Sequence, residues 1–303
     1  MDVAGLIAGF LTALCSSIAF LSSTWALKRT PGLSAPGLLA DAGIVMGVLS
    51  IALLGIFWEP RLFSEGFAAR LPALLGAAVF FSLGQTLVFA AQRSVEASRV
   101  VPLLGLKLPV LAVISVCFMH DSIGWLKCVA IALAVLSAFV LNNAGTRIPA
   151  KSFLLVIAAC VSYSLSDTYL TKLTDLIERG LSESTLMAAI HCTILTYIMV
   201  GLIAACILAF WHKPLTRAAF AHSVPFSVFW LGCIVALNIA FARLGTVHGV
   251  ILQNTRAIWT ILLTPVFIML GCTALETRLT ASLFWRRLAA SAMVLLAAFL
   301  YSL

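Results

Sequence analysis

The sequence predicts an all-α integral membrane protein, from its composition and from the arrangement of its apolar residues. Of its 303 residues, 62% are hydrophobic and 10% are charged, and the mean hydropathy is +1.12. Soluble domains carry about 25% charged residues, so no soluble fold of this length could hide so much apolar surface. The apolar residues form long runs, and no long polar segment remains for a soluble domain. Because irregular backbone and open sheet edges are not tolerated in lipid, these runs should be helices.

Ten of the runs are long enough to cross a bilayer. A span needs roughly 20 mainly apolar residues to cross a hydrocarbon core of about 30 Å. The predicted spans cover residues 3–26, 37–57, 69–91, 97–118, 123–142, 152–172, 184–210, 222–243, 247–270 and 283–302.

The charges in the connecting loops predict how the chain lies in the membrane. Loops that follow odd-numbered spans hold eleven Lys or Arg residues, whereas loops that follow even-numbered spans hold six of them and most of the acids. The positive-inside rule therefore places the odd loops in the cytoplasm and both termini on the outer side. The same bias accounts for the net charge of +8, so we expect no nucleic-acid partner.

Two sequence matches indicate an internal repeat. CSSIAFLSSTWALK (15–28) aligns with CVSYSLSDTYLTKL (160–173) at an offset of 145 residues. FAAQRSVEASRVV (89–101) aligns with FARLGTVHGVILQ (241–253) at an offset of 152 residues. The matches occur in the same order with similar offsets, so we interpret the chain as two related units.

The units are residues 1–145 and 146–303, and each contains five predicted spans. Because five is an odd number, the second unit must enter the membrane upside down relative to the first. Inverted repeats are a construction principle of secondary transporters, in which the solute binds near the midplane and access alternates between the two sides. The sequence therefore predicts ten transmembrane helices as two inverted five-helix repeats.

The chain resembles the drug/metabolite transporter (DMT) superfamily, with repeats of the EamA type. The last segment, LETRLTASLFWRRLAASAMVLLAAFLYSL (275–303), is similar to the family's final signature, and the turns RSVEASRVVP and LGTVHGVILQ fit its small-residue turn in both halves. Two features depart from the pattern: HDSI replaces the usual glycine–glutamate pair, and Lys107 and Arg256 replace apolar residues. The resemblance implies transport of a small solute, often outward, in the bacterial inner (plasma) membrane.

Lys107 lies in the middle of the fourth predicted span, between Pro102 and Pro109. A cation at the centre of a membrane helix costs about 2.5–3.5 kcal/mol on insertion scales. It could extend to the interface or form a structural ion pair, or it could line a polar cavity. Each proline removes a backbone donor and frees a carbonyl one turn earlier. The bend that this predicts favours the cavity.

Arg256 follows Gln253, Asn254 and Thr255 inside the ninth predicted span. Four consecutive hydrogen-bonding residues need a protein or water partner there, so we expect them to line the same cavity. No equally deep acid is evident in the sequence for Arg256 or Lys107. We therefore expect a solute with a carboxylate or phosphate group, bound by the Arg256 fork and the point charge of Lys107.

Tyr163 and Trp259 are the aromatic residues expected to contact the solute. An aromatic cage would suit a quaternary amine such as choline, but Lys107 and Arg256 would repel that cation.

Asp167 and His191 are candidate coupling residues, because a carboxylate and an imidazole at one depth could exchange protons. The alternative is that Asp167 pairs with Lys172 or Arg179 and that His191 hydrogen-bonds a carbonyl.

Glu96 and His248 lie on the equivalent turns after the third and eighth spans and are candidate gating residues. The alternative for Glu96 is a surface ion-pair cluster with Arg93 and Arg99.

We expect no enzyme, metal site or cofactor. The sequence has no H-E-x-x-H, G-x-S-x-G or phosphate-binding G-x-x-x-x-G-K-[ST] motif, and none of its eight cysteines forms a C-x-x-C pair. The expected function is secondary active transport of a small metabolite, such as an amino acid, an organic acid or another anionic solute, by an exporter that is a monomer or homodimer and uses protons as the coupling ion. Two alternatives stay open: a lipid-handling, flippase-like protein and an importer of a quaternary amine.

Overall fold

The computed structural model describes residues 3–64, 66–107, 109–110, 124–142, 148–211, 217–244, 246–272, 275 and 280–302. All regular structure within these residues is helical. Eight of the helical segments are long and apolar enough to cross a membrane, and two shorter apolar helices cover 97–106 and 125–141. The prediction of an all-α membrane protein is thereby confirmed.

Helices lie at every predicted span. The long helices are α1 (Val3–Arg29), α2 (Ala35–Ile56), α3 (Phe67–Gln92), α7 (Ala150–Leu181), α8 (Thr185–Trp211), α9 (Arg217–Leu244) and α12 (Ala281–Ser302). The shorter ones are η1 (Pro60–Phe63), α4 (Ala97–Leu103), η2 (Leu104–Leu106), α6 (Trp125–Asn142), α10 (Thr246–Asn254) and α11 (Arg256–Met269). The part of the fourth predicted span after residue 110 lies outside the described residues.

Local sequence signals set several helix ends. The Ser34 hydroxyl accepts a hydrogen bond of 3.1 Å from the Gly37 amide at the start of α2, where Pro36 occupies the first turn. A serine N-cap and an early proline are typical helix-start signals. α7 ends where Ser182 takes a left-handed backbone conformation with φ of 53°, which terminates the helical hydrogen-bond pattern.

Small residues let several helices cross closely. A Cβ atom on Gly47 of α2 would lie 2.9 Å from Cα of Gly201 on α8. A Cβ on Gly84 of α3 would lie 2.9 Å from the Tyr163 ring of α7. Glycines at such crossings are how membrane helices approach closely enough to pack. The second crossing also fixes the place of Tyr163.

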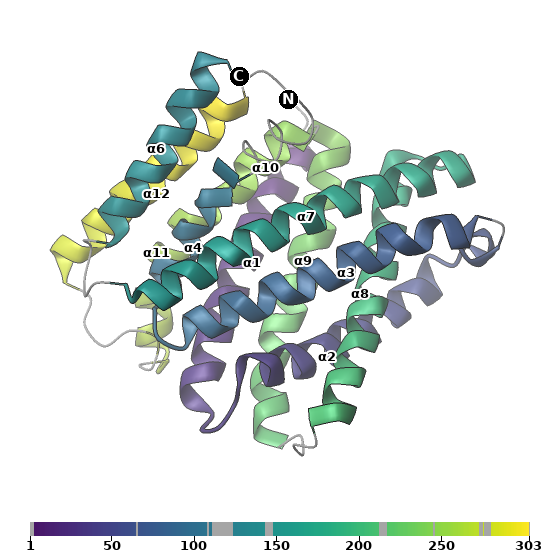
Figure 1. Ribbon diagram of the computed structural model, residues 1–303, viewed down its shortest axis with the longest axis horizontal. Helices are drawn as coiled ribbons and strands as arrows, with labels where there is room; N and C mark the ends of the chain where they lie inside the picture. The colour runs from purple at the N-terminus through teal and green to yellow at the C-terminus, as the bar shows by residue number, and fades with distance from the viewer. Residues whose placement is uncertain are drawn as a thin grey trace.

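The most extensive helix contacts join α1 with α9, α3 with α7, α2 with α8, and α6 with α12. Figure 1 shows α6 and α12 side by side at one edge of the bundle, with α7 running alongside α3. The broken segments, α4 with η2 and α10 with α11, lie between this edge and the remaining helices, and α4 contacts α11.

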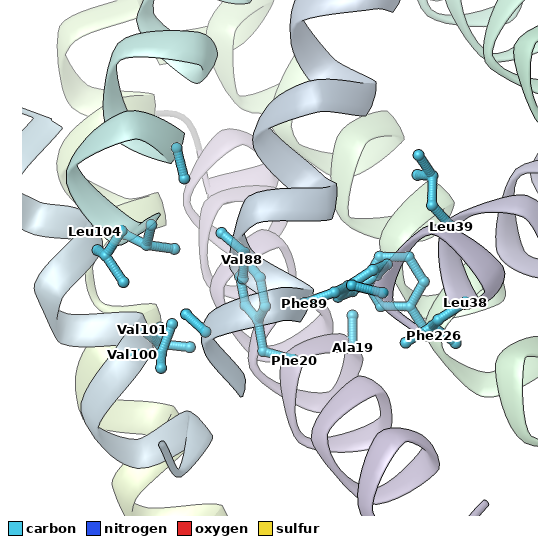
Figure 2. Close-up of a cluster of buried hydrophobic side chains, with 14 of the residues drawn as sticks. Ala19, Phe20, Leu38, Leu39, Val88, Phe89, Val100, Val101, Leu104 and Phe226 are labelled. Carbon is cyan, nitrogen blue, oxygen red and sulfur yellow. The ribbon is translucent and has the colours of Figure 1, made fainter. Parts of the chain in front are cut away.

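A buried apolar cluster holds α4 and η2 in place. Figure 2 shows Val100, Val101 and Leu104 beside Phe20 of α1 and Val88 of α3. The cluster continues through the edge-to-face ring pair of Phe89 and Phe226, whose centroids are 5.0 Å apart. Such a packed core allows little movement of the backbone that carries it, so it positions the residues that follow η2, beginning with Lys107.

Candidate functional site

Two spans are interrupted near their centres. α4 changes into the 3-10 turn η2 at Leu104, two residues after Pro102, and α10 and α11 are separated by Thr255. Pro102 cannot donate a backbone hydrogen bond to the turn that precedes it, which weakens the helix next to the first interruption. At the second, the Thr255 hydroxyl donates to the Leu252 carbonyl at 2.7 Å. Such breaks leave polar backbone groups inside a membrane span, where protein or water must satisfy them.

Each break is followed by a cation at a similar depth. Lys107 comes ten residues after Ala97, where α4 begins, and Arg256 comes ten residues after Thr246, where α10 begins. Ten residues of helix extend about 15 Å, which is half of a hydrocarbon core of about 30 Å. Both cations therefore belong to the middle of the bundle.

The Lys107 ammonium forms an ion pair with the Asp167 carboxylate of α7. This corrects the expectation that Lys107 has no matched acid, and it gives Asp167 a partner other than Lys172 or Arg179. The flexible stem of lysine can bridge residues that start at different depths, which sequence position does not reveal. The pair is partly open, because the Lys107 side chain is 24% exposed and that of Asp167 is 54% exposed.

Arg256 has a different environment. Its guanidinium carbon lies 5.9 Å from the centroid of the Phe20 ring, which is within range of a cation–π attraction. Its own carbonyl accepts hydrogen bonds from Ser17 at 2.9 Å and Thr260 at 2.8 Å, which fix the backbone at the start of α11. Among the described residues, no carboxylate lies within ion-pairing distance of this guanidinium.

The two cations approach the same region of α7. Lys107 and Arg256 are the charged groups close enough to the Cys160 thiol to act on it electrostatically. Arg256 also lies within electrostatic range of Tyr163 and Asp167. The arrangement thus gathers two cations and one carboxylate around a single stretch of α7, with one positive charge in excess.

Tyr163 contacts a buried amide that the sequence reading missed. Its hydroxyl donates a 2.8 Å hydrogen bond to Oε1 of Gln85 on α3, whose side chain is fully buried. Nε2 of Gln85 has no hydrogen-bond partner among the described residues. A buried donor without a partner is costly, and its position beside Tyr163 offers a hydrogen bond to a bound molecule. The available signal was the position of this amide inside the third predicted span.

An aromatic cluster adjoins Arg256 through Phe20. Trp230 donates a 2.7 Å hydrogen bond from Nε1 to the Tyr197 hydroxyl, and its ring is 5.4 Å from that of Phe20 and 5.8 Å from that of Phe81. Phe20 links the cluster to Arg256. The sequence predicted solute contacts for Tyr163 and Trp259, and it also offered Phe20 and Trp230 as aromatic residues in or near spans.

The polar run before Arg256 lies at the break in the ninth span. Gln253 and Asn254 end α10, Trp259 lies one turn into α11, and all three are partly buried. Thr255 lines an apolar groove of about 430 Å³ between α1, α10 and α12. The groove is lined by Phe10, Ile251, Leu252, Thr255, Ala292, Leu295, Leu296 and Phe299.

His191 does not meet Asp167. Its Nδ1 lies 2.8 Å from a carboxylate oxygen of Glu183, and its Nε2 lies 2.9 Å from the Phe57 carbonyl. The expectation of an Asp167–His191 pair is therefore wrong, because each side chain has its own nearer partner. The alternative, a histidine bonded to a carbonyl, describes His191 correctly.

The two predicted gating residues have different outcomes. Glu96 pairs with Arg99 at 3.7 Å, but the Arg99 side chain is 2% exposed, so this is not the surface cluster considered above. The backbone of His248 belongs to α10, and its side chain lies outside the described residues.

Comparison with known proteins identifies the fold alone. No protein family matches the chain, and no curated protein sequence matches it. One solved structure, described only as a crystal structure of a protein, is similar over 99% of this chain and 96% of its own length, with a TM-score of 0.60 and 12% sequence identity. That likeness shows a shared helical arrangement and carries no information on activity.

Proposed function

We propose that this protein is a secondary active transporter, built from inverted repeats of residues 1–145 and 146–303, that moves a small anionic solute by alternating access. The observation that carries the proposal is the pair of interrupted spans. η2 begins at Leu104 and α11 begins at Arg256, 152 residues apart, which is the offset at which 89–101 aligns with 241–253. Discontinuous helices at the repeat interface are where secondary transporters bind their solutes.

The helix packing supports the same symmetry. If the first and second repeats exchange places, the contact of α1 with α9 becomes that of α7 with α3. The contacts of α2 with α8 and of α6 with α12 are unchanged by the exchange. These are the four most extensive helix pairs in the described structure, as expected if five helices of one repeat match five of the other.

The charges around α7 favour an anionic solute. Asp167 neutralises Lys107, which leaves the positive charge of Arg256 unmatched among the described residues. An unpaired cation away from water is costly, and a carboxylate or phosphate would relieve that cost. Arg256 can bind such a group through two parallel hydrogen bonds, and the solute can then draw Lys107 away from Asp167.

The same charges disfavour a quaternary amine. Phe20, Phe81 and Trp230 could face a cation, but Arg256 already lies over the Phe20 ring, and its positive charge would repel the amine. The described charges therefore support an anion transporter better than an importer of choline-like solutes.

A lipid-handling protein is the second candidate, and the apolar groove at Thr255 favours it. The groove could hold an acyl chain. Of the described residues that line the groove, Thr255 alone is polar, so this lining offers little to a charged headgroup. Transport of a lipid would need a polar path beside the apolar one, which makes the central charges the better guide to function.

The resemblance to the DMT superfamily, of EamA type, extends the proposal. It favours export and a bacterial inner membrane. The loop charges separately favour an orientation with both termini on the outer side. Protons are the coupling ion that we propose, since carboxylates and imidazoles lie in or near the spans.

A thermal-shift screen of the purified protein tests the proposal. We expect inorganic phosphate, dicarboxylates or amino acids to raise the unfolding temperature, because a ligand present at 100 times its Kd stabilises by about 2.7 kcal/mol. Arg256→Met should abolish the shift, whereas Arg179→Met, on an exposed part of α7, should not. Stabilisation by quaternary amines alone, or by phospholipid alone, would replace the proposal with one of its rivals.

A further inference from the structure

Gln85 of α3 has a hydrogen-bond donor that the described structure leaves unused. The side chain is fully buried, and Oε1 accepts a 2.8 Å hydrogen bond from the Tyr163 hydroxyl of α7. Nε2 has no hydrogen-bond partner among the described residues. A buried donor without a partner destabilises a fold, so packing alone does not account for this amide.

The Gln85 donor is held in place, unlike the hydroxyl groups that also lack a partner. Ser82, one turn earlier on α3, has a buried hydroxyl of that kind. A serine hydroxyl can rotate to bond a carbonyl in the preceding turn of its own helix. The Gln85 amide is planar, and turning Nε2 toward another acceptor would break the bond between Tyr163 and Oε1. The direction of the unused donor is therefore set by Tyr163.

The packing of α3 against α7 positions Tyr163 in turn. Gly84 leaves room for the Tyr163 ring, because a Cβ atom at this glycine would lie 2.9 Å from the ring. The Phe81 ring, on the turn of α3 before Gln85, lies 6.4 Å from the Tyr163 ring between centroids. Both contacts come from the part of α3 that carries Gln85, so the tyrosine hydroxyl and the amide are positioned together.

A row of aromatic contacts joins Gln85 to the central cations. Phe81 lies 5.8 Å from Trp230, and Trp230 lies 5.4 Å from Phe20, measured between ring centroids. The Arg256 guanidinium lies over the Phe20 ring. The row thus has a positive charge at one end and a neutral hydrogen-bond donor at the other.

We propose that Gln85 is a specificity-determining residue that donates a hydrogen bond from Nε2 to an uncharged oxygen of the solute. The inference rests on the proposed anion transport, because it assumes that a carboxylate or phosphate of the solute binds Arg256. An N–H group can bond only to an acceptor, so the second group of the solute is a carbonyl or hydroxyl oxygen and not an ammonium. The substrate class is thereby narrowed to oxo acids, hydroxy acids and phosphorylated carbonyl compounds.

The unused donor makes the site discriminate between solutes. An anion without the extra oxygen leaves Nε2 unpaired, as it is in the described structure. An anion with this oxygen supplies the missing acceptor. Sites built to hydrogen-bond a group of the substrate reject analogues that lack the group.

Isothermal titration calorimetry of the whole protein in detergent tests the inference with two pairs of acids. The pairs are 2-oxoglutarate with glutarate and pyruvate with propionate, and each pair differs by one carbonyl in place of a methylene. Wild type should bind the oxo acid of at least one pair roughly 5- to 150-fold more tightly, the range expected when a solute supplies the partner of a buried donor. Equal affinity within both pairs, or tighter binding of the acids without the carbonyl, would overturn the inference.

Gln85→Leu separates the donor from the rest of the site. This variant should bind both members of the preferred pair with similar affinity, because it removes Nε2 and leaves Arg256 unchanged. The matched control is Gln92→Leu, since Gln92 is equally buried on α3 but is bonded at both ends of its amide, to Ser23 at 2.8 Å and to the Phe20 carbonyl at 3.4 Å. The control should keep the preference, and an undiminished preference in Gln85→Leu would contradict a role for the donor.

Thermal unfolding without any solute gives a second readout. The double variant Gln85→Leu with Tyr163→Phe removes the unused donor together with the bond that orients it. Replacing both partners of a hydrogen bond by apolar groups of similar shape can be neutral or stabilising. The double variant should therefore unfold at or above the wild-type temperature, whereas Gln92→Leu should unfold below it. A lower unfolding temperature in the double variant would mean that the amide stabilises the fold, and the inference would be wrong.

Failure of the proposed transport would give a different result. If neither the four acids nor inorganic phosphate binds, the anion site at Arg256 is wrong and the inference falls with it. If the acids bind without any preference for the carbonyl, the anion site stands and the role of Gln85 alone is wrong.

Discussion

Replacing Asp167 with asparagine should strengthen binding of an anionic solute. The substitution removes the carboxylate that pairs with Lys107 and nearly preserves the size of the side chain. In the proposed cycle this carboxylate competes with the solute for the lysine ammonium. Without the competitor, Lys107 is available from the outset, and the solute no longer meets a nearby negative charge.

The exposure of the ion pair sets the size of the effect. Asp167 is 54% exposed and Lys107 is 24% exposed. In the proposed water-filled cavity, solvent would screen their attraction as in a surface pair. Exposed ion pairs contribute about 0.2–1 kcal/mol. At 25 °C this corresponds to roughly 1.4- to 5-fold tighter binding of the anion.

Isothermal titration calorimetry at pH 7 measures the effect, with inorganic phosphate and succinate as probes. Asp175→Asn is the matched control, because Asp175 is an exposed acid on the same helix, and it should bind as wild type. Weaker binding in Asp167→Asn would refute the reasoning. Asp167 would then contact the solute or a coupling cation directly, and its pairing with Lys107 would not be a competing interaction.

Three further predictions concern the site, the packing and the topology. Lys107→Met should weaken anion binding roughly 10- to 150-fold, as expected for loss of a hydrogen bond to a charged group. The double variant Lys107→Met with Asp167→Asn should regain any stability that the single variant loses by leaving Asp167 unpaired. Unchanged anion binding in Lys107→Met would mean that the lysine is structural. Gly47→Val should cost about 1–3 kcal/mol by overpacking the α2–α8 crossing and lower the unfolding temperature, whereas Gly55→Val, with open space at its Cβ, should not; equal melting of the two variants would contradict the crossing. A reporter enzyme that is active only outside the cytoplasm should be active when it is fused after Leu303. Activity of a reporter that works only in the cytoplasm would contradict the predicted orientation.

The positions of the helices could be predicted because hydropathy reports where lipid replaces water. The ends of the helices were harder to predict from the sequence. The sixth predicted span covers 152–172, but α7 continues to Leu181. Residues beyond Lys172 are too polar for lipid, yet Leu173, Ile177 and Leu181 recur every four residues and are buried. That spacing marks one face of a helix and could have extended the prediction.

The central charges could be located but not paired from the sequence. Lys107 and Arg256 stood out because cations in a span are expensive. The partner of Lys107 lies 60 residues away on α7, and the Phe57 carbonyl lies 134 residues from His191. Such contacts depend on how helices cross, and the one-dimensional pattern contains no information on the crossing. Gln85 could have been noted as an amide inside a span, but its contact with Tyr163 depends on how α3 and α7 cross.

Solute exchange in proteoliposomes tests the central claim most directly. Vesicles loaded with an anion that stabilises the protein would be diluted into the same anion carrying a radiolabel, and uptake would be followed for wild type and Arg256→Met. We expect saturable uptake driven by exchange in wild type and its loss in the variant, because a transporter with alternating access returns loaded sites to both faces. Absence of saturable exchange for every anion that binds, or equal exchange in Arg256→Met, would contradict a central anion site served by the two interrupted spans.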